Sequence, residues 1–288
     1  MQRIRAVAIL FVFLTSTLLL IPWQSFLLRY KFKSHKTFPS RFNRYLCWLF
    51  GIRITVIGKP VQDRGVLMVA NHTSYFDILV LSGLARISFV AKSEVAGWPL
   101  FGTLAKLQQT VFVERAKRTQ AFEAKDQMRE RLLAGDALVL FPEGTSNDGN
   151  RVLAFKSALM GAVETEIGPD AQGRPRHVPV QPVSLAYVGL HGLPMGRENR
   201  PLYAWYGDME LVPHLWEALV SGPIEVVVEF HAPVAVDTVG GRKALAAQVE
   251  AIVRRGQAGA LAGNYRAEPA APEPAVDVGK GELTEAAA

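Results

Sequence analysis

An uncharged stretch of 23 residues near the amino terminus limits how this chain folds more than any other feature. It lies between Arg5 and Arg29. A helix of this length spans about 34 Å, which is enough to cross a hydrocarbon core of about 30 Å. Trp23 suits a membrane interface, whereas Pro22 and Gln24 weaken the last turn. Two interpretations stay open: a helix that spans the membrane, and a helix or helical hairpin that lies in one leaflet.

The same stretch is a poor match to a cleaved signal peptide. The start, MQRIR, has the positive charge of such a segment, but no small-x-small cleavage site follows the apolar run. The residues at that point are IPWQSF. The sequence therefore favours a retained membrane anchor.

The positive charge of the chain is concentrated beside this anchor. The whole chain has 32 Lys and Arg against 26 Asp and Glu, but residues 1–62 contain ten basic residues and no acidic one. The remaining 226 residues hold 22 basic against 26 acidic side chains. A nucleic-acid module is disfavoured because the body of the chain is net acidic. The positive-inside rule places the body in the cytoplasm, at the cytoplasmic membrane.

The segment that follows the apolar stretch mixes basic and aromatic side chains. It reads RYKFKSHKTFPSRFNRYLCWLFGIR. The pattern fits an amphipathic core helix at 40–50, but next to an apolar 23-mer it favours a helix in the membrane interface. Cys47 is the only cysteine, which excludes an intrachain disulfide framework and a cysteine zinc cluster, and its apolar neighbours indicate a packing role.

From Gly51 onward, short apolar runs alternate with helical patterns. We expect strands at 51–58, 65–70, 87–91, 110–114, 136–141, 178–188, 201–207 and 224–230. We expect helices at 75–85, 117–135, 155–167 and 241–256. Such alternation predicts an α/β fold with a mostly parallel central sheet flanked by helices, preceded by the N-terminal membrane helix or hairpin.

Three regions are predicted along the chain. Residues 1–50 form the membrane anchor and the basic amphipathic segment, and residues 51–262 form one catalytic domain. Residues 263–288 are rich in Ala, Pro and Glu. Because that tail has little apolar bulk to bury, we expect it to be disordered.

The first segment with chemical potential is VANHTSYFD, where a strand ends and a helix begins. His72 stands at the carboxyl end of the strand, where open α/β sheets place ligands. Asp77, one turn into the helix, can reach back to one imidazole nitrogen and leave the other as a base. The structural alternative is a capping box with Ser74 as N-cap, which makes His72 an ordinary loop residue.

The second segment is LVLFPEGTSNDG, in which a strand runs into a loop with turn residues. The structural alternative to a functional role is a loop that ends the strand, with a Pro turn and an Asp-Gly turn. The segment resembles a G-x-S-x-G elbow, but Asp148 stands where the second Gly is needed. The chain has no P-loop lysine, G-x-G-x-x-G or H-E-x-x-H motif. The other five histidines have no metal-ligand spacing, so no metal site is predicted.

Four ordered blocks together resemble the glycerolipid acyltransferase family, which includes the 1-acylglycerol-3-phosphate acyltransferases. Asn71-His72 with Asp77 matches its N-H-x-x-x-x-D block, and Phe141–Thr145 matches its F-P-E-G-T block. The other two blocks are Val111–Arg115 and Val178–Val183. The resemblance covers about residues 50–230. It implies a reaction at a membrane, in which an acyl chain moves from acyl-CoA or acyl carrier protein to a lysolipid hydroxyl.

The resemblance also implies residue roles. His72 is the general base and Asp77 orients it, and no acyl-enzyme or cofactor is expected. Oxyanion donors are expected among backbone N–H groups near 71–77 or 141–145. The residues implied in binding the acceptor are Arg115, Glu143, Gly144, Thr145 and Lys156. For the two cations among them, Arg115 and Lys156, a solvated surface position is the alternative.

The chain departs from the family pattern at two points. The third block usually continues Thr-Arg-Ser, but Ser146 and Asn147 follow Thr145 here, so one cation near the acceptor is missing. Ala158 stands where the next helix usually has Gly. Arg151 or Lys156 can compensate. If either residue supplies the missing charge, we expect lysophosphatidate as the acceptor. If neither does, the alternative is a less anionic lysolipid such as a lyso-ornithine lipid.

Two other classes of function compete with acyl transfer. A membrane-anchored lipid hydrolase requires an activated nucleophile, for which Ser74 or Ser146 is the candidate. A non-catalytic scaffold tolerates the loss of His72 and Asp77. Acyl-chain length, the acyl donor and the oligomeric state are left open by the sequence.

Overall fold

The computed structural model describes residues 1–114, 118–169, 173 and 175–265. Its helices are α1 (Gln2–Arg29), α2 (Phe38–Phe50), α3 (Phe76–Leu84), α4 (Phe101–Leu107), α5 (Arg118–Leu133), α6 (Leu211–Ser221) and α7 (Arg242–Leu261). Short 3₁₀ helices are η1 (Lys33–Lys36), η2 (Ser93–Gly97), η3 (Ser157–Glu164), η4 (Arg200–Leu202) and η5 (Val236–Thr238). Of the tail predicted at 263–288, residues 266–288 lie outside the described residues.

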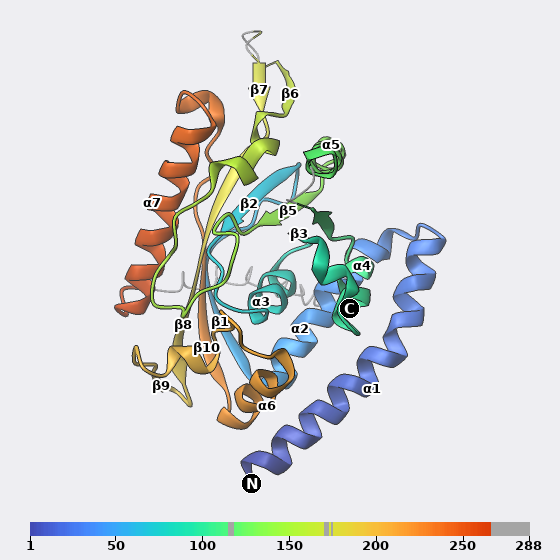
Figure 1. Ribbon diagram of the computed structural model, residues 1–288, viewed down its shortest axis with the longest axis vertical. Helices are drawn as coiled ribbons and strands as arrows, with labels where there is room; N and C mark the ends of the chain where they lie inside the picture. Colours follow the sequence, from blue (N-terminus) through green and yellow to red (C-terminus); the bar gives the residue numbers. More distant parts are fainter. Residues whose placement is uncertain (115–117, 170–172, 174, 266–288) are drawn as a thin grey trace, which may run out of the picture.

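A central sheet of eight strands organises the body (Figure 1). Its order is β1-β10-β8-β2-β5-β3-β4, with β9 beside β8. The strands are β1 (Ile52–Gly58), β2 (Val66–Ala70), β3 (Ser88–Lys92), β4 (Val111–Val113), β5 (Ala137–Leu140), β8 (Val180–Leu190), β9 (Leu193–Pro194) and β10 (Ile224–Phe230). Neighbours are parallel except at the β10–β8 and β8–β9 pairs. The predicted α/β fold with a mostly parallel sheet is confirmed.

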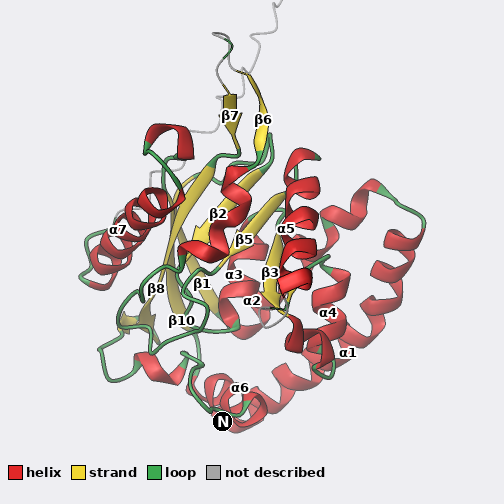
Figure 2. Ribbon diagram, turned by 45° about the horizontal axis from the view of Figure 1, so that its top comes forward, coloured by secondary structure: helices red, strands yellow, loops and turns green. Residues whose placement is uncertain are grey.

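Strand β2 explains why the central strands read as unbroken apolar runs. Val66 and Met68 pack into a core with α2, α3 and α6 on one face of the sheet. Leu67 and Val69 pack into a second core with α5 and α7 on the other face (Figure 2). All of these side chains are at most 2% exposed. A strand that is covered on both faces needs apolar residues at every position.

Helix α1 lies along the outside of the body, with its amino terminus beside α6 (Figure 1). It is long and apolar enough to cross a membrane, with a mean hydropathy of 2.4 in its most apolar window. Only 17% of that window is buried. The guanidinium of Arg5 donates to the Leu219 carbonyl in α6 at 2.8 Å, and the Gln24 amide donates to the Leu107 carbonyl in α4 at 3.1 Å. Both ends of α1 are therefore tied to the body.

Two predicted elements differ from the observed ones. The segment 201–207 reads as a strand because its aromatic residues alternate, but it is a loop that begins with η4. The helix expected at 155–167 is η3, which has non-helical backbone angles at Met160 and passes into β6 (Glu166–Pro169). Strand β6 pairs with β7 (Pro175–His177) in a hairpin beyond the main sheet (Figure 2). At 201–207, the Trp205 N–H bonds the Thr73 carbonyl, and this tertiary contact outweighs weak local propensity.

Candidate active site

The two predicted chemical segments meet at one edge of the sheet. Strands β2 and β5 are parallel neighbours, with Val69 opposite Leu140, so their carboxyl ends lie side by side. The Asn147 backbone N–H and side-chain amide both donate to the His72 carbonyl, at 3.3 and 3.2 Å. The loop after β5 therefore fixes the backbone on which His72 stands.

Asn71 fixes the same backbone from the other side. Its amide donates to the Leu185 carbonyl and its oxygen accepts the Leu185 N–H, both at 2.9 Å. The Asn71 side chain is fully buried. It extends the β2–β8 hydrogen bonding by one residue, so His72 leaves the sheet at a defined point.

His72 and Asp77 form a hydrogen-bonded pair. Nδ1 of His72 lies 2.8 Å from Oδ2 of Asp77, and the Asp77 side chain is fully buried. Because the carboxylate accepts at this distance, Nδ1 carries the proton and Nε2 presents its lone pair. Within the described residues Nε2 has no hydrogen-bond partner, and 21% of the His72 side chain is exposed. The ring stacks on Phe141, with 4.1 Å between ring centroids.

The capping-box alternative is only half present. Oδ2 of Asp77 accepts the backbone N–H groups of Thr73 at 2.7 Å and Ser74 at 3.0 Å. However, helix α3 begins after Tyr75, and the Ser74 hydroxyl has no partner in the described part of the chain. Asp77 therefore shapes the turn and holds the imidazole with the same oxygen.

Tyr187 is a residue of this site that sequence reasoning missed. It lies on β8, and its hydroxyl donates to Oδ1 of Asp77 at 2.7 Å. Burial, and secondly the charge of Asp77, raises the pKa of Tyr187 well above its ordinary value, so the hydroxyl stays a donor. The only sequence signal is a buried tyrosine in an apolar strand, because its hydroxyl needs a partner there.

Glu143 accepts hydrogen bonds from the backbone and side chains around the site. Oε1 accepts the His72 N–H at 2.8 Å. Oε2 accepts the Asn147 amide at 2.8 Å and the Leu153 N–H at 2.9 Å. Burial raises the pKa of Glu143 to about 7, against the opposing effect of these donors. This carboxylate therefore joins three segments of the site.

The remaining predicted binding residues are placed as follows. Gly144 has φ +75°, a left-handed conformation that favours glycine, and it turns the chain toward the exposed Thr145. The Lys156 side chain is exposed, and its backbone N–H donates to the Pro142 carbonyl at 2.9 Å. Arg115 lies outside the described residues.

The 201–207 segment covers this edge of the sheet. The Trp205 N–H donates to the Thr73 carbonyl at 2.9 Å, and the Ser146 hydroxyl donates to the Trp205 carbonyl. The Trp205 ring contacts Tyr75 and Trp98, with centroids 6.1 and 5.6 Å apart. The backbone hydrogen bond to the His72 turn explains why an apparent strand is a loop here.

An apolar cavity of about 170 Å³ lies beneath this aromatic cluster. Helices α1, α2, α3 and α4 line it, and Tyr75 and Trp98 of the aromatic cluster are among its lining residues. Thr17 and Gln24 of α1 also line it, and Thr17 Oγ1 and Gln24 Oε1 are buried without a partner in the described part of the chain. The docking of α1 on the body therefore creates a partly open cavity with mostly apolar walls.

Other chemistries find little support among the described residues. They contain no His, Cys, Asp and Glu group that could hold a metal ion. Burial raises the pKa of the Cys47 thiol to about 12, which makes it a poor nucleophile. Ser184 lies 2.5 Å from Nε2 of His231, but it is 2% exposed and also bonds the Val253 carbonyl of α7. A substrate cannot reach that serine in this packing.

Known proteins resemble this chain in sequence and in fold. A family model described as Acyltransferase matches residues 53–186. The lyso-ornithine lipid O-acyltransferase of Brucella abortus is 48% identical over 238 residues, which cover 83% of this chain and 88% of that protein. The lyso-ornithine lipid O-acyltransferase of Rhizobium meliloti is 43% identical over 251 residues, covering 87% and 85%.

Relatives of a second kind match over less of the chain. The 1-acyl-sn-glycerol-3-phosphate acyltransferase of Neisseria gonorrhoeae is 31% identical over 176 residues, which cover 60% of this chain and 63% of that protein. The crystal structure of the 1-acyl-sn-glycerophosphate acyltransferase of Thermotoga maritima superposes with a TM-score of 0.62 at 27% identity, covering 89% of this chain and 96% of that one.

Proposed function

This chain belongs to the acyltransferase family, and from that membership we propose that it transfers a fatty acyl chain from a thioester to the hydroxyl of a lyso-ornithine lipid. The resemblance found in the four sequence blocks is thereby confirmed, and the protein is an acyltransferase. The relatives favour the alternative acceptor over lysophosphatidate, because the lyso-ornithine enzymes share more identity over more of the chain.

The missing cation supports the same acceptor. Where the family pattern has Arg, Ser146 uses its hydroxyl to hold the Trp205 carbonyl. A phosphate monoester carries close to two negative charges and is best held by paired guanidinium groups. An ornithine headgroup carries one carboxylate and one ammonium group, so it needs fewer cations. Lysophosphatidate is the second candidate, supported by the 1-acyl-sn-glycerol-3-phosphate relatives.

The observation that carries the mechanism is the His72–Asp77 pair with its unpartnered Nε2. Nε2 takes the proton of the acceptor hydroxyl as its oxygen attacks the thioester carbonyl. The new C–O bond forms, the C–S bond breaks, and His72 returns the proton to the leaving thiolate. Because Asp77 fixes the ring through Nδ1, the base is oriented before substrate binds.

The oxyanion of the tetrahedral intermediate needs donors beside this pair. The N–H groups of His72, Thr73 and Ser74 already donate to Glu143 and Asp77. The 141–145 loop is the other expected source. Its Gly144 N–H donates to the Phe141 carbonyl at 3.1 Å, so we propose that other backbone N–H groups of this loop stabilise the oxyanion. The apolar cavity beneath Tyr75 and Trp98 suits the acyl chain, because its walls are almost entirely apolar.

We further infer that α1 lies in one leaflet of the cytoplasmic membrane. Its outward side presents a large exposed apolar surface, which includes Phe11, Leu18 and Trp23. A spanning helix would carry its amino end across the bilayer, away from the body. Arg5 instead bonds the Leu219 carbonyl of α6, so an anchor lying along the interface fits both ends of the helix.

A substrate panel tests the activity. Purified protein in detergent receives labelled acyl-CoA or acyl carrier protein with lyso-ornithine lipid or lysophosphatidate, and the lipid products are separated. We expect ester product from lyso-ornithine lipid. Product from lysophosphatidate alone would establish the second candidate, and release of free fatty acid alone would establish a hydrolase.

Two variants test the residue roles in the same assay. His72→Ala should lose at least about a thousandfold in turnover while its membrane attachment persists. His177→Ala, a partly exposed histidine on β7, is the matched control and should keep activity. Ser146→Arg should shift the preference toward lysophosphatidate by about tenfold, since it restores the missing cation. Retained turnover in His72→Ala would sink the mechanism.

A further inference from the structure

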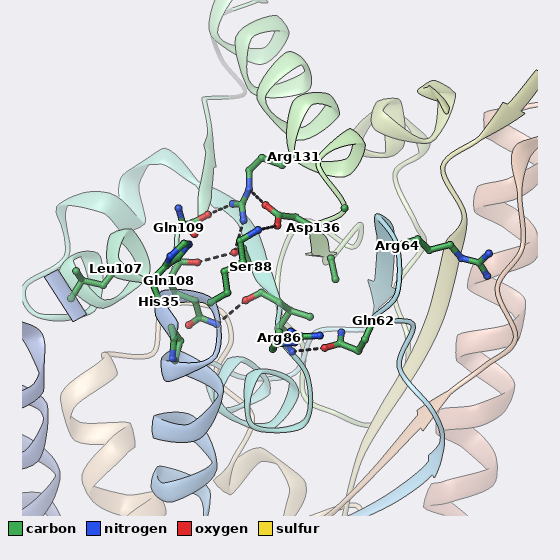
Figure 3. Close-up of a pocket in the computed structure, with 15 residues that line it drawn as sticks. His35, Gln62, Arg64, Arg86, Ser88, Leu107, Gln108, Gln109, Arg131 and Asp136 are labelled. Carbon is green, nitrogen blue, oxygen red and sulfur yellow. Dashed lines mark hydrogen bonds and ion pairs between the residues drawn. The ribbon is translucent and has the colours of Figure 1, made fainter. Parts of the chain in front are cut away.

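A second cavity, with polar walls, lies at the opposite edge of the sheet from His72. It has a volume of about 170 Å³ and lies at the amino ends of β5 and β3, near Ala137 and Ser88 (Figure 3). These strands are parallel to β2, and His72 follows the carboxyl end of β2. The length of β2 therefore separates this cavity from the catalytic pair, by about 16 Å.

Positive charge dominates the lining of this basic cavity. Four cationic side chains line it, and Asp136 is its one carboxylate. The cations are Lys36, Arg64, Arg86 and Arg131. Counting only Lys, Arg and Asp side chains, the described lining holds a surplus of three positive charges. A cavity of this kind attracts anions from solvent, and the attraction weakens with salt.

A fixed framework holds the cavity open. Arg131 donates to Asp136 Oδ2 and to the Ser88 hydroxyl, both at 2.9 Å, and also to the Gln109 carbonyl (Figure 3). Lys36 donates to Asp136 Oδ1 at 2.7 Å. Despite partial burial, these two cations hold the pKa of Asp136 below its ordinary value. One carboxylate thus organises two cations and leaves the cavity basic.

Arg86 supplies the donors that this framework does not use. Its backbone N–H donates to Gln62 at 3.0 Å, but its guanidinium has no hydrogen bond or ion pair within the described residues. The Lys36 ammonium has three protons and gives one to Asp136. Arg64 lies at the rim, and Figure 3 shows its side chain extending away from the others. Arg86 and Lys36 are therefore the groups available to a ligand.

The cavity forms only because η1, the turn between α1 and α2, docks against the body. Lys36 and His35 belong to η1, and the Gln24 amide of α1 donates to the His35 carbonyl at 3.0 Å. Just before η1, Tyr30 and Phe32 expose their aromatic rings. Aromatic side chains of this kind mark the headgroup level of a membrane. The cavity therefore opens beside the surface that meets lipid headgroups.

We propose that this basic cavity is a phosphate-binding site, in which Arg86 and Lys36 hold a phosphate group apart from the acyl-transfer centre. A guanidinium and an ammonium that line one cavity supply the kinds of donor that phosphate oxygens accept. The group belongs either to an anionic phospholipid of the surrounding membrane or to a soluble phosphate. Occupancy ties η1 to the body, and through Gln24 it steadies the end of α1.

Binding measurements on the full chain in detergent test this site. The variant is Lys36→Gln with Arg86→Gln, and the matched control is Lys33→Gln with Arg41→Gln. The control removes one lysine and one arginine from exposed positions of the same basic region that do not line the cavity. Calorimetry with inorganic phosphate forms one arm. Flotation with phosphatidylcholine vesicles, with or without phosphatidylglycerol, forms the other.

We expect the cavity variant to weaken binding by about tenfold relative to the control variant in at least one arm. A difference in both arms assigns a site open to soluble phosphate. A difference only with phosphatidylglycerol vesicles assigns a lipid headgroup. If both double variants bind alike in both arms, only the general charge of the region acts, and the proposal is overturned. Circular dichroism checks that each variant is folded.

Discussion

A carboxylate lies at each edge of the sheet, in a different environment. At the carboxyl edge Asp77 is fully buried and accepts hydrogen bonds from His72, Thr73, Ser74 and Tyr187. At the amino edge Asp136 keeps 15% of its side chain exposed and pairs with two cations. Asp77 thus sits among hydrogen-bond donors that fix its geometry, whereas Asp136 sits among charges that solvent can screen.

The difference shows that one sheet can hold a fixed hydrogen-bonded pair at one edge and solvent-accessible charges at the other. A buried carboxylate with both oxygens hydrogen-bonded holds its partner in one orientation, which a base requires. Exposed charges on long side chains have little orientation of their own, but they attract anions over several ångströms. We therefore expect mutations at the carboxyl edge to change turnover, and mutations at the amino edge to change binding or stability modestly.

The largest effect is expected when the carboxylate at the carboxyl edge, Asp77, is replaced by its amide. Asp77→Asn turns an amide N–H₂ toward groups that donate, so the His72 ring loses its fixed orientation. Turnover should fall about a thousandfold, which corresponds to about 4 kcal/mol in the barrier. Single-turnover assays with saturating acyl-CoA measure it. Activity within a factor of ten of the original would remove Asp77 from the mechanism.

Glu143, which also lies at the carboxyl edge, should make the free energy of unfolding depend on pH. Its pKa is raised from 4.5 to about 7 in the folded protein, so the unfolded chain releases this proton first as pH rises. The free energy of unfolding contributed by Glu143 is therefore highest below pH 4.5 and is lost as pH rises to about 7, by up to about 3 kcal/mol.

Denaturant unfolding of the original protein and of Glu143→Gln across this pH range measures the contribution of Glu143. The difference in unfolding free energy between the two proteins should change with pH in that direction. Parallel curves would contradict the raised pKa.

Tyr187→Phe sharpens the comparison within the carboxyl edge. It removes one hydrogen bond to the buried Asp77 carboxylate and leaves the packing almost unchanged. Stability should fall by about 2 kcal/mol, and kcat should fall more than KM changes, because Tyr187 acts through Asp77. Tyr203→Phe, another buried tyrosine whose hydroxyl bonds only backbone carbonyls, is the control and should keep kcat. Equal loss of kcat in both would indicate a packing effect.

The smallest effect is expected at the amino edge. Asp136→Asn removes the charge shared by Lys36 and Arg131 and should cost about 1 kcal/mol of stability near neutral pH. Because the pKa of Asp136 is lowered in the folded state, this difference should begin to shrink as pH falls below the ordinary value of 3.8 and should be lost as pH falls through the lowered pKa. Turnover should stay within about twofold. A large loss of turnover would show that the two edges are not independent.

Sequence alone determined the architecture and the position of the pair. Apolar runs and helical periods predict the α/β sheet, because strands buried on both faces need apolar residues throughout. The spacing of His72 and Asp77 across a strand end and the first helical turn is local, so it can be read directly. The charge-free 23-mer and its basic flank likewise indicate the membrane anchor without any tertiary contact.

Only the tertiary structure decided which distant residues complete each edge. Tyr187 reaches Asp77 from β8 across 110 residues, and Lys36 reaches Asp136 across 100. The strand expected at 201–207 is a loop because Trp205 bonds the His72 turn. Such contacts depend on strand order and helix docking, which local propensity does not encode. A sequence pattern reports short-range geometry, whereas the partners of a buried charge are chosen by the chain segments that the fold brings around it.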